Sequence, residues 1–301
     1  MERERIGGQA VIEGVMMRSP NAYSVAVRKP DGSVSIKQEF TTKNKKADWK
    51  KWPIVRGGFN LVDNMYLGIK TLMYASNIAY DEDEVMDDKA LYLSVFFGIL
   101  ASVGLFIVLP TILTGFISDR VDDILALNLI EGFVRISLFV LYVYFIGKME
   151  EINRVFQYHG AEHKTINCYE NDCPLTVEEA KKYTTIHIRC GTAFMLLVML
   201  LAVLVFSFFG WQSVIERVIT RIILLPLIAG ISYELIMLAG KNKESKFWRM
   251  VLVPGLWMQK LTTKEPSDDQ LEIAIIALKS VLEKQNEIDE TFEQGVKASA
   301  R

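Results

Sequence analysis

Four long apolar runs constrain the fold of this chain most strongly. They lie in the middle of the sequence and cover Leu91–Phe116, Leu129–Met149, Ala193–Phe209 and Ile222–Ala239. About 20 apolar residues in a helix are enough to cross the hydrocarbon core of a bilayer. In addition, 50% of the 301 residues are hydrophobic and the mean hydropathy is positive, which is unusual for a soluble protein. The sequence therefore predicts a mostly α, polytopic membrane protein with about four transmembrane helices.

The distribution of basic residues predicts how these helices are oriented. Lysine and arginine gather in the N-terminal region, between the second and third runs and in the C-terminal tail, whereas the other two loops carry few of them. Such an excess is typical of cytoplasmic segments. We therefore expect both termini and the loop at residues 150–191 to lie in the cytoplasm. The expected partner is the lipid bilayer. The net charge of −2 gives no reason to expect nucleic acid, and a protein partner or a homo-oligomer is compatible with the sequence.

The segments before the first run predict two smaller units. Residues 1–50 predict a cytoplasmic β-containing domain, because Tyr23–Val27 and Ser33–Phe40 have the composition and alternation of strands. Pro30-Asp31-Gly32 between them is typical of a β-hairpin turn. Residues 51–90 predict an amphipathic helix followed by an acidic linker.

The C-terminal tail, residues 241–301, predicts a second amphipathic helix. A capping-box pattern begins at Ser267, apolar residues follow at helical spacing, and the expected helix ends near Asn286. The apolar stripe consists of Leu271, Ile275, Leu278 and Leu282. The remaining expected units are transmembrane helices 1 and 2 at residues 91–149, the cytoplasmic loop at residues 150–191 and transmembrane helices 3 and 4 at residues 192–240.

All the histidines and cysteines of the chain fall within 32 consecutive residues. They are His159, His163, Cys168, Cys173, His187 and Cys190. Histidine and cysteine are the usual zinc ligands, so this clustering predicts a site for Zn²⁺ or another divalent metal. The three cysteines are an odd number in a chain without a secretory signal, which does not indicate a disulfide framework.

Within this segment, residues 159–163 spell His-Gly-Ala-Glu-His, the inverted form of a zinc-hydrolase motif. Two histidines four residues apart project from one face of a helix and can reach one ion. Glu162 is then placed to accept a proton from water as a general base. His187 and Cys190, directly before the third apolar run, offer further ligands.

Two acidic residues outside the cluster are further candidates. Glu13 lies in the glycine-rich stretch Ile6–Pro20 and could serve as an acid or a metal ligand, or could simply be a solvated turn residue. Glu234 lies inside the fourth apolar run, where an ionisable group is costly unless it is paired or functional. We expect it to face the His/Cys cluster as a ligand or to form a structural pair with Arg135 or Arg221.

Four strings of this chain together resemble the YqhQ-like family of bacterial membrane proteins. They are GGQAVIEGVMMRSP near the start, YHGAEHKTINCYE in the middle, HIRCGT before the third run and PGLWMQKLTTKEPSDDQLEIAI near the end. The family is usually described as predicted metal-dependent enzymes of undefined reaction. The resemblance implies a bacterial cytoplasmic-membrane location and a site formed by Glu13, His159, Glu162, His163, Cys168, His187 and Cys190.

This chain departs from the family pattern at two positions. A proline usually follows the third histidine, where this chain has Ile188, and Cys173 does not belong to the pattern. The first departure puts the local turn in doubt, and the second suggests that Cys173 is incidental.

Three functions compete at this point. The first is a membrane-bound zinc hydrolase that acts at the cytoplasmic membrane surface on a lipid-linked or membrane-proximal substrate, with Glu162 or Glu13 as general base. The second is a non-enzymatic scaffold or assembly factor in which a closed His/Cys zinc site is structural. The third is a small transporter that uses Glu234, against which the lack of an inverted repeat argues.

Overall fold

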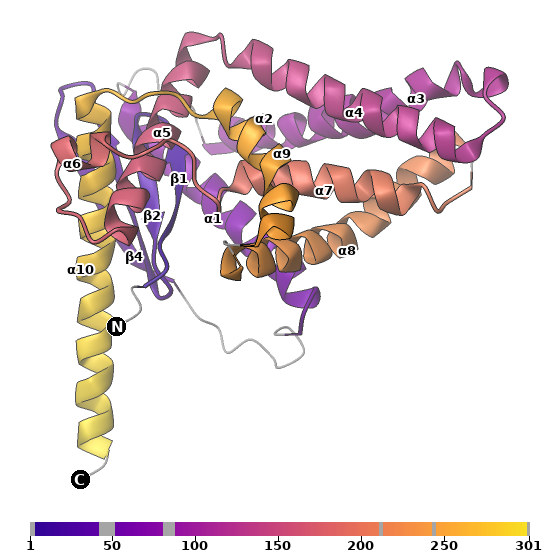
Figure 1. The fold of residues 1–301 in the computed structure, drawn as a ribbon. Coiled ribbons are helices and arrows are strands. Elements are labelled where there is room, and N and C mark those ends of the chain that lie inside the picture. The colour runs from indigo at the N-terminus through magenta and orange to yellow at the C-terminus, as the bar shows by residue number, and fades with distance from the viewer. Residues whose placement is uncertain (1–3, 42–51, 81–87, 211–212, 243–244, 300–301) are drawn as a thin grey trace.

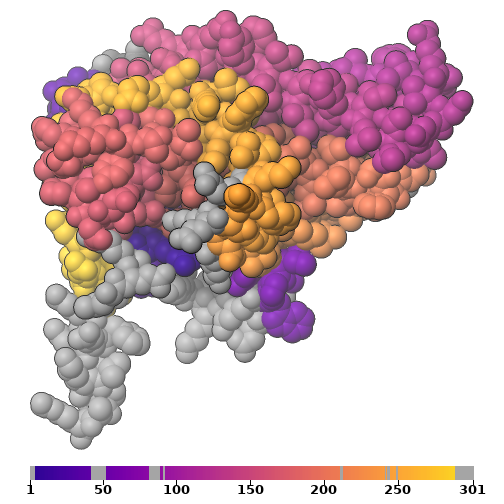
Figure 2. All heavy atoms as spheres, in the orientation of Figure 1, coloured from indigo at the N-terminus to yellow at the C-terminus, as the bar shows by residue number. Residues whose placement is uncertain are grey.

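The computed structural model describes residues 4–41, 52–80, 88–210, 213–242 and 245–299 (Figure 1). A small sheet, with helices on both of its faces, lies beside a bundle of long apolar helices. The bundle extends to one side of the sheet, and Figure 2 shows it projecting from the rest of the molecule as an arm. The predicted acidic linker falls mostly on residues 81–87, which lie outside the described residues.

The sheet has four antiparallel strands in the order β1-β2-β3-β4. These are β1 (Gly7–Val11), β2 (Gly14–Arg18), β3 (Ala22–Arg28) and β4 (Val34–Phe40). The predicted hairpin is confirmed as β3 and β4, with Gly32 at a φ of 81° in the turn. The prediction missed β1 and β2, because β1 begins with two glycines and the first four residues of β2 are all buried, so neither strand shows a clear alternation of apolar and polar residues.

Helices cover both faces of the sheet. On one face, Val11, Met16 and Val25 pack against α1 (Val55–Ala79), the predicted amphipathic helix. The other face packs against α5 (Glu150–Glu170) and α10 (Asp268–Ser299) through Val15, Met17 and Ala26. β1 and β4 remain as the edge strands.

The C-terminal helix α10 confirms the predicted apolar stripe. Leu271, Ile275 and Leu278 are buried in the core beneath the sheet, and Leu282 packs against them. The side chain of Gln270 accepts a hydrogen bond from the Ser267 backbone N–H at 3.0 Å, as the capping pattern predicts. The helix runs on to Ser299 instead of ending near Asn286, and Figure 1 shows it extending well past the sheet.

The apolar runs form helices, which confirms the mostly α membrane fold. Three described segments are long and apolar enough to span a membrane, namely Tyr92–Gly115, Ile124–Ile146 and Val214–Gly240. The first of them consists of α2 (Asp88–Val103), η2 (Gly104–Val108) and α3 (Leu109–Gly115), and the others are α4 (Ile124–Ile146) and α8 (Val214–Lys241). The third expected span, Ala193–Phe209, corresponds to α7 (Gly191–Phe206), an apolar helix of only 16 residues. Short helices η3 (Ser118–Arg120) and α6 (Val177–Lys181) lie in loops, and α9 (Lys246–Thr262) follows α8.

A buried ionic cluster joins three of the bundle helices. Glu131 of α4 is only 1% exposed and pairs with Arg135 at 2.8 Å, with Arg217 at 3.2 Å and with Arg221 at 2.5 Å. Thr111 of α3 donates a hydrogen bond to the same carboxylate at 3.0 Å. We expected Arg135 or Arg221 to pair with Glu234. Both pair with Glu131 instead, because it lies one turn from Arg135 on α4 and directly opposite Arg221 of α8.

The ionic cluster predicts a large effect of removing its single acid. Glu131→Gln removes the carboxylate that pairs with three buried arginines, and breaking a buried ion pair in this way costs about 3–5 kcal/mol. We expect a clearly lower thermal midpoint for the detergent-solubilised protein, measured by the fluorescence of its tryptophans. Glu283→Gln, at an exposed position in the interior of α10, is the matched control. Equal midpoints for the two variants would show that the arginines need no acid.

Candidate metal centre

The two motif histidines lie one turn apart on the same face of α5. Glu150 and Glu151 occupy its first turn, where negative charge complements the helix dipole. The ring centroids of His159 and His163 are 4.4 Å apart. Between them, Gly160 lets the helix contact the chain that follows α9, since a Cβ there would overlap the carbonyl oxygen of Lys264.

Backbone carbonyls fix both imidazoles. The Nδ1 of His159 lies 2.9 Å from the carbonyl oxygen of Thr262, and the Nδ1 of His163 lies 2.6 Å from that of Thr185. A carbonyl only accepts hydrogen bonds, so each Nδ1 carries the proton and each Nε2 of the neutral ring keeps its lone pair. This arrangement is typical of histidines that bind metals through Nε2. Burial lowers the pKa of His163, which also favours the neutral ring, although hydrogen bonding to Cys190 opposes this effect.

Cys190 completes a group of three potential ligands. Its Sγ lies 3.2 Å from the Nε2 of His159, and the ligand atoms of His159, His163 and Cys190 all lie within 4.8 Å of one another. Cys190 is the N-cap residue of α7, and its sulfur accepts a hydrogen bond from the Thr192 backbone N–H at 3.4 Å. The N-terminus of a helix favours negative charge, and a metal-bound cysteine is a thiolate. The sequence separation of 31 residues between His159 and Cys190 is thus closed by the fold.

The carboxyl group of Glu162 is buried beside the histidines and beneath β1. Glu162 is 5% exposed, and its Oε2 has no hydrogen-bond partner among the described residues. A Cβ at Gly8 would lie 2.8 Å from this carboxyl, so a glycine in β1 makes room for it. Burial raises the pKa of Glu162 to about 7, against the opposing influence of His159 and of a hydrogen bond from the backbone of Ala10. A carboxyl group with this pKa can take up and release a proton near neutral pH.

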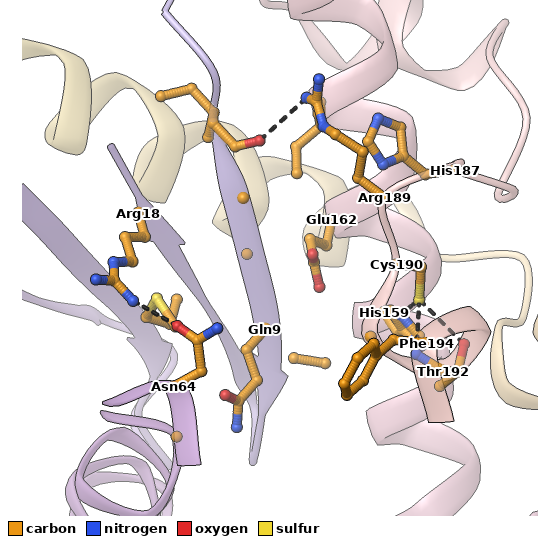
Figure 3. A pocket seen from close by; sticks show the side chains of 18 of the residues that line it. Gln9, Arg18, Asn64, His159, Glu162, His187, Arg189, Cys190, Thr192 and Phe194 are labelled. Carbon is orange, nitrogen blue, oxygen red and sulfur yellow. Dashed lines mark hydrogen bonds between the residues drawn. The ribbon is translucent and has the colours of Figure 1, made fainter. Parts of the chain in front are cut away.

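The group of ligands and Glu162 lie in the wall of a cavity of about 1300 Å³. The cavity lies between the sheet and the bundle, and Figure 3 shows Glu162 between β1 and the His159–Cys190 pair. β1, α1, α5, α7 and α8 all contribute to its lining. The lining is apolar toward the bundle, where Phe194, Met195, Ile236 and Met237 contribute, and it contains Arg18 and Arg189 elsewhere.

His187 lines the same cavity but lies outside the group of three ligands. Its ring centroid is 5.7 Å from that of His163, and its Nε2 is 3.5 Å from a carboxylate oxygen of Glu170. Its backbone is held by Gln259, which accepts from the His187 N–H at 2.9 Å and donates to the His187 carbonyl at 2.8 Å. Gln259 is fully buried, so this pair of bonds fixes the approach of the chain to Cys190.

The fold does not bring the other candidate residues to this group. Cys168 is buried in the core beneath the sheet, where its thiol donates to the Pro174 carbonyl, because it lies on a different face of α5 from the histidines. Cys173 contacts the hydroxyl of Tyr183 at 2.6 Å.

The two remaining acids are both held by arginines. Glu13, in the turn between β1 and β2 at a φ of 49°, accepts a hydrogen bond from the Nε of Arg154 at 2.6 Å and does not line the cavity. Glu234 accepts one from the Nε of Arg56 at 2.7 Å. Arg56 lies in the first turn of α1, which packs along α8, so Glu234 joins these two helices instead of facing the metal ligands.

Sequence reasoning missed the parts of the site that come from the backbone. The carbonyls of Thr185 and Thr262 carry no sequence signal, because any residue can supply them. Gly8 belongs to the glycine-rich stretch Ile6–Pro20, but no sequence pattern identifies Glu162 as its neighbour.

The fold and the site define a polytopic membrane protein that carries a candidate metal centre between its helical bundle and a small sheet. The chain belongs to the family described as protein of unknown function (DUF1385), whose sequence model matches residues 52–284. It is 35% identical over 295 residues to the uncharacterized protein YqhQ of Bacillus subtilis (strain 168), and the match covers 92% of each chain. The resemblance to YqhQ-like proteins is thus confirmed. No solved structure matches the chain.

The contact at Gly160 generates a prediction about stability. Gly160→Ala forces α5 away from Lys264, and overpacking of this kind costs about 1–3 kcal/mol or more. We expect a lower thermal midpoint in detergent. Gly98→Ala, in the middle of helix α2 with nothing near its Cβ position, is the matched control and should be neutral or slightly stabilising. A midpoint for Gly160→Ala at or above that of the control would contradict the close contact.

Proposed function

We propose that this protein is a membrane-bound, zinc-dependent hydrolase. The observation that carries the proposal is the convergence of His159, His163 and Cys190 beside a buried oxygen of Glu162 that has no hydrogen-bond partner in the described parts of the chain. All four residues lie in the wall of one large cavity. Catalytic zinc sites commonly have three protein ligands and one open position, whereas structural sites are closed by four. The described residues bring together three such ligands, which supports a catalytic zinc site over a structural one.

The donor set fits zinc. Two histidines with carbonyl-bonded Nδ1 atoms present Nε2 to a common point, and a cysteine at a helix N-terminus supplies sulfur. When bound, zinc supplies a Lewis acid that polarises a carbonyl oxygen and makes a coordinated water more acidic.

Glu162 is the general base of the proposed reaction. Its carboxylate takes a proton from the attacking water, and the water oxygen bonds to the carbonyl carbon of the substrate. The bond from that carbon to the leaving nitrogen or oxygen then breaks, and Glu162 passes the proton to the leaving atom. The products are a carboxylic acid and an amine or alcohol. Burial of Glu162 and its raised pKa support both proton transfers.

The proposed site lies at the cytoplasmic surface of the bacterial membrane. Cys190 directly precedes the apolar helix α7, and α5 follows soon after the end of α4. The excess of basic residues in this part of the chain supports a cytoplasmic location. A substrate would therefore be lipid-linked or would lie close to the bilayer.

Zinc content tests the proposal directly. We expect one equivalent of zinc per chain in the detergent-purified protein by mass spectrometry, and its loss in His163→Ala. In Cys190→Ser we expect zinc to bind at least about tenfold more weakly, while Cys173→Ser, a cysteine away from the site, keeps wild-type affinity. No zinc in the wild type, even after incubation with the metal, would overturn the proposal.

The role of Glu162 is tested by activity at constant zinc content. Glu162→Gln is expected to keep the metal and to lower hydrolysis of a screened substrate by about 10²–10⁴-fold. Gly8→Ala should lower it as well, because the added Cβ displaces the carboxyl, whereas Gly210→Ala has space around its Cβ and should not. Full activity of zinc-loaded Glu162→Gln would contradict the proposed base, and zinc bound without hydrolysis of any substrate would favour a structural site.

A further inference from the structure

We infer that the substrate is an extended peptide segment that pairs with the free edge of β1. This inference rests on the proposed hydrolase function and names its substrate class. It starts from the position of β1, which is an edge strand: its residues 7–10 and the preceding Ile6 all line the cavity. Proteins usually cover the edge of a sheet or interrupt it with charged residues or bulges, because the unpaired backbone groups of an edge strand can pair with another strand. Here this edge opens onto the cavity that contains the metal ligands.

The register of the sheet shows which backbone groups face the cavity. β1 pairs with β2 from Gly7↔Arg18 to Val11↔Gly14, and the last pair closes a two-residue turn. In such a hairpin the closing pair is hydrogen-bonded, and bonded pairs then alternate along the ladder. Gly7 and Gln9 therefore bond to β2, whereas Ile6, Gly8 and Ala10 direct their N–H and C=O groups to the free edge.

Two contacts agree with this assignment. The carbonyl of Ile6 accepts a hydrogen bond from the Arg189 side chain at 3.4 Å, as Figure 3 shows, and the backbone of Ala10 bonds to Glu162. Because these contacts occupy the Ile6 carbonyl and an Ala10 backbone group, the pairing point for a peptide is Gly8, which lies between them and directs its N–H and C=O to the edge.

An extended peptide matches this edge better than a lipid does. Along one edge of an extended peptide, the N–H and C=O of every second residue face the same way, which is the pattern that strand addition requires. A peptide paired at Gly8 would lie about 4.8 Å from β1, the usual spacing of strands. Because the carboxyl of Glu162 is in contact with Gly8, a peptide bond at this point lies next to the general base.

The cavity also offers space for the side chains of such a peptide. A Cβ at Gly7 would meet no atom within 4 Å, so this side of β1 is open. The facing walls are formed by Leu61 and Met65 of α1 and by Phe194 and Met195 of α7. We therefore expect apolar side chains near the cleaved bond, as in a segment next to a membrane span.

The first experiment identifies cleavage. Zinc-loaded full-length protein in detergent is incubated with a peptide library prepared from a bacterial proteome digest, and new N-termini are found by mass spectrometry. We expect cleavage flanked by apolar residues in the wild type and at least about a hundredfold less in zinc-loaded Glu162→Gln. A parallel reaction contains phospholipid vesicles, and the release of fatty acid or headgroup is measured.

The second experiment tests the edge. In a cleaved peptide, backbone amides are N-methylated one at a time, which removes a donor without changing the side chains. We expect cleavage to fall at least about tenfold at alternate positions and to persist at those between, because only every second amide faces β1. Gly7→Leu should shift the preference at one peptide position from large to small side chains. Gly98→Leu is the control.

The outcomes separate this inference from the function on which it rests. Zinc binding with hydrolysis of lipids but not of peptides would overturn the peptide class and leave the hydrolase in place. Peptide cleavage with no alternation in the N-methyl series would overturn pairing with β1. The absence of bound zinc would overturn the hydrolase and the inference together.

Discussion

The candidate metal centre depends on direct contact between the backbone of α5 and the chain that joins α9 to α10. The two segments come closest at Gly160, which has no side chain to separate them. The Lys264 N–H also donates a hydrogen bond to the Phe156 carbonyl at 2.9 Å. The same connecting segment supplies the Thr262 carbonyl that orients His159. One contact thus sets the position of the helix and the rotation of a ligand, so a residue more than a hundred positions away in sequence controls the geometry of the motif.

The sequence predicted those parts of the molecule that depend on local patterns. The apolar runs, the hairpin with its Gly32 turn and the stripe of α10 follow from periodicity and turn chemistry, and His159 and His163 were placed together by their spacing. The sequence could not show which distant cysteine joins them. Cys168 is only five residues from His163, yet it faces the core beneath the sheet. Cys190 reaches the histidines because two hydrogen bonds from the Gln259 side chain fix the backbone of nearby His187.

The charged residues of the bundle were the least predictable. An acid inside an apolar helix needs a counter-charge, but which arginine supplies it depends on how the helices pack. Glu131 gathers three arginines near the start of α4 and α8, while Glu234 pairs with Arg56 of α1. The Glu131 cluster lies beside Phe206, about 24 Å from Cys190 along α7 at 1.5 Å per residue. The two polar regions are thus separated by the length of an apolar helix.

Helix α1 has a consequence for the shape of the cavity. Near its N-terminus, Gly57 packs against Gly230 of α8, and the Arg56–Glu234 pair reinforces that contact. Toward its other end, Leu67 and Ala75 are buried against the sheet. α1 therefore acts as a strut of fixed length between the sheet and the bundle. The two parts cannot approach each other without breaking its packing at one end, so the width of the cavity is built into the fold and does not have to be created by the molecule that enters it.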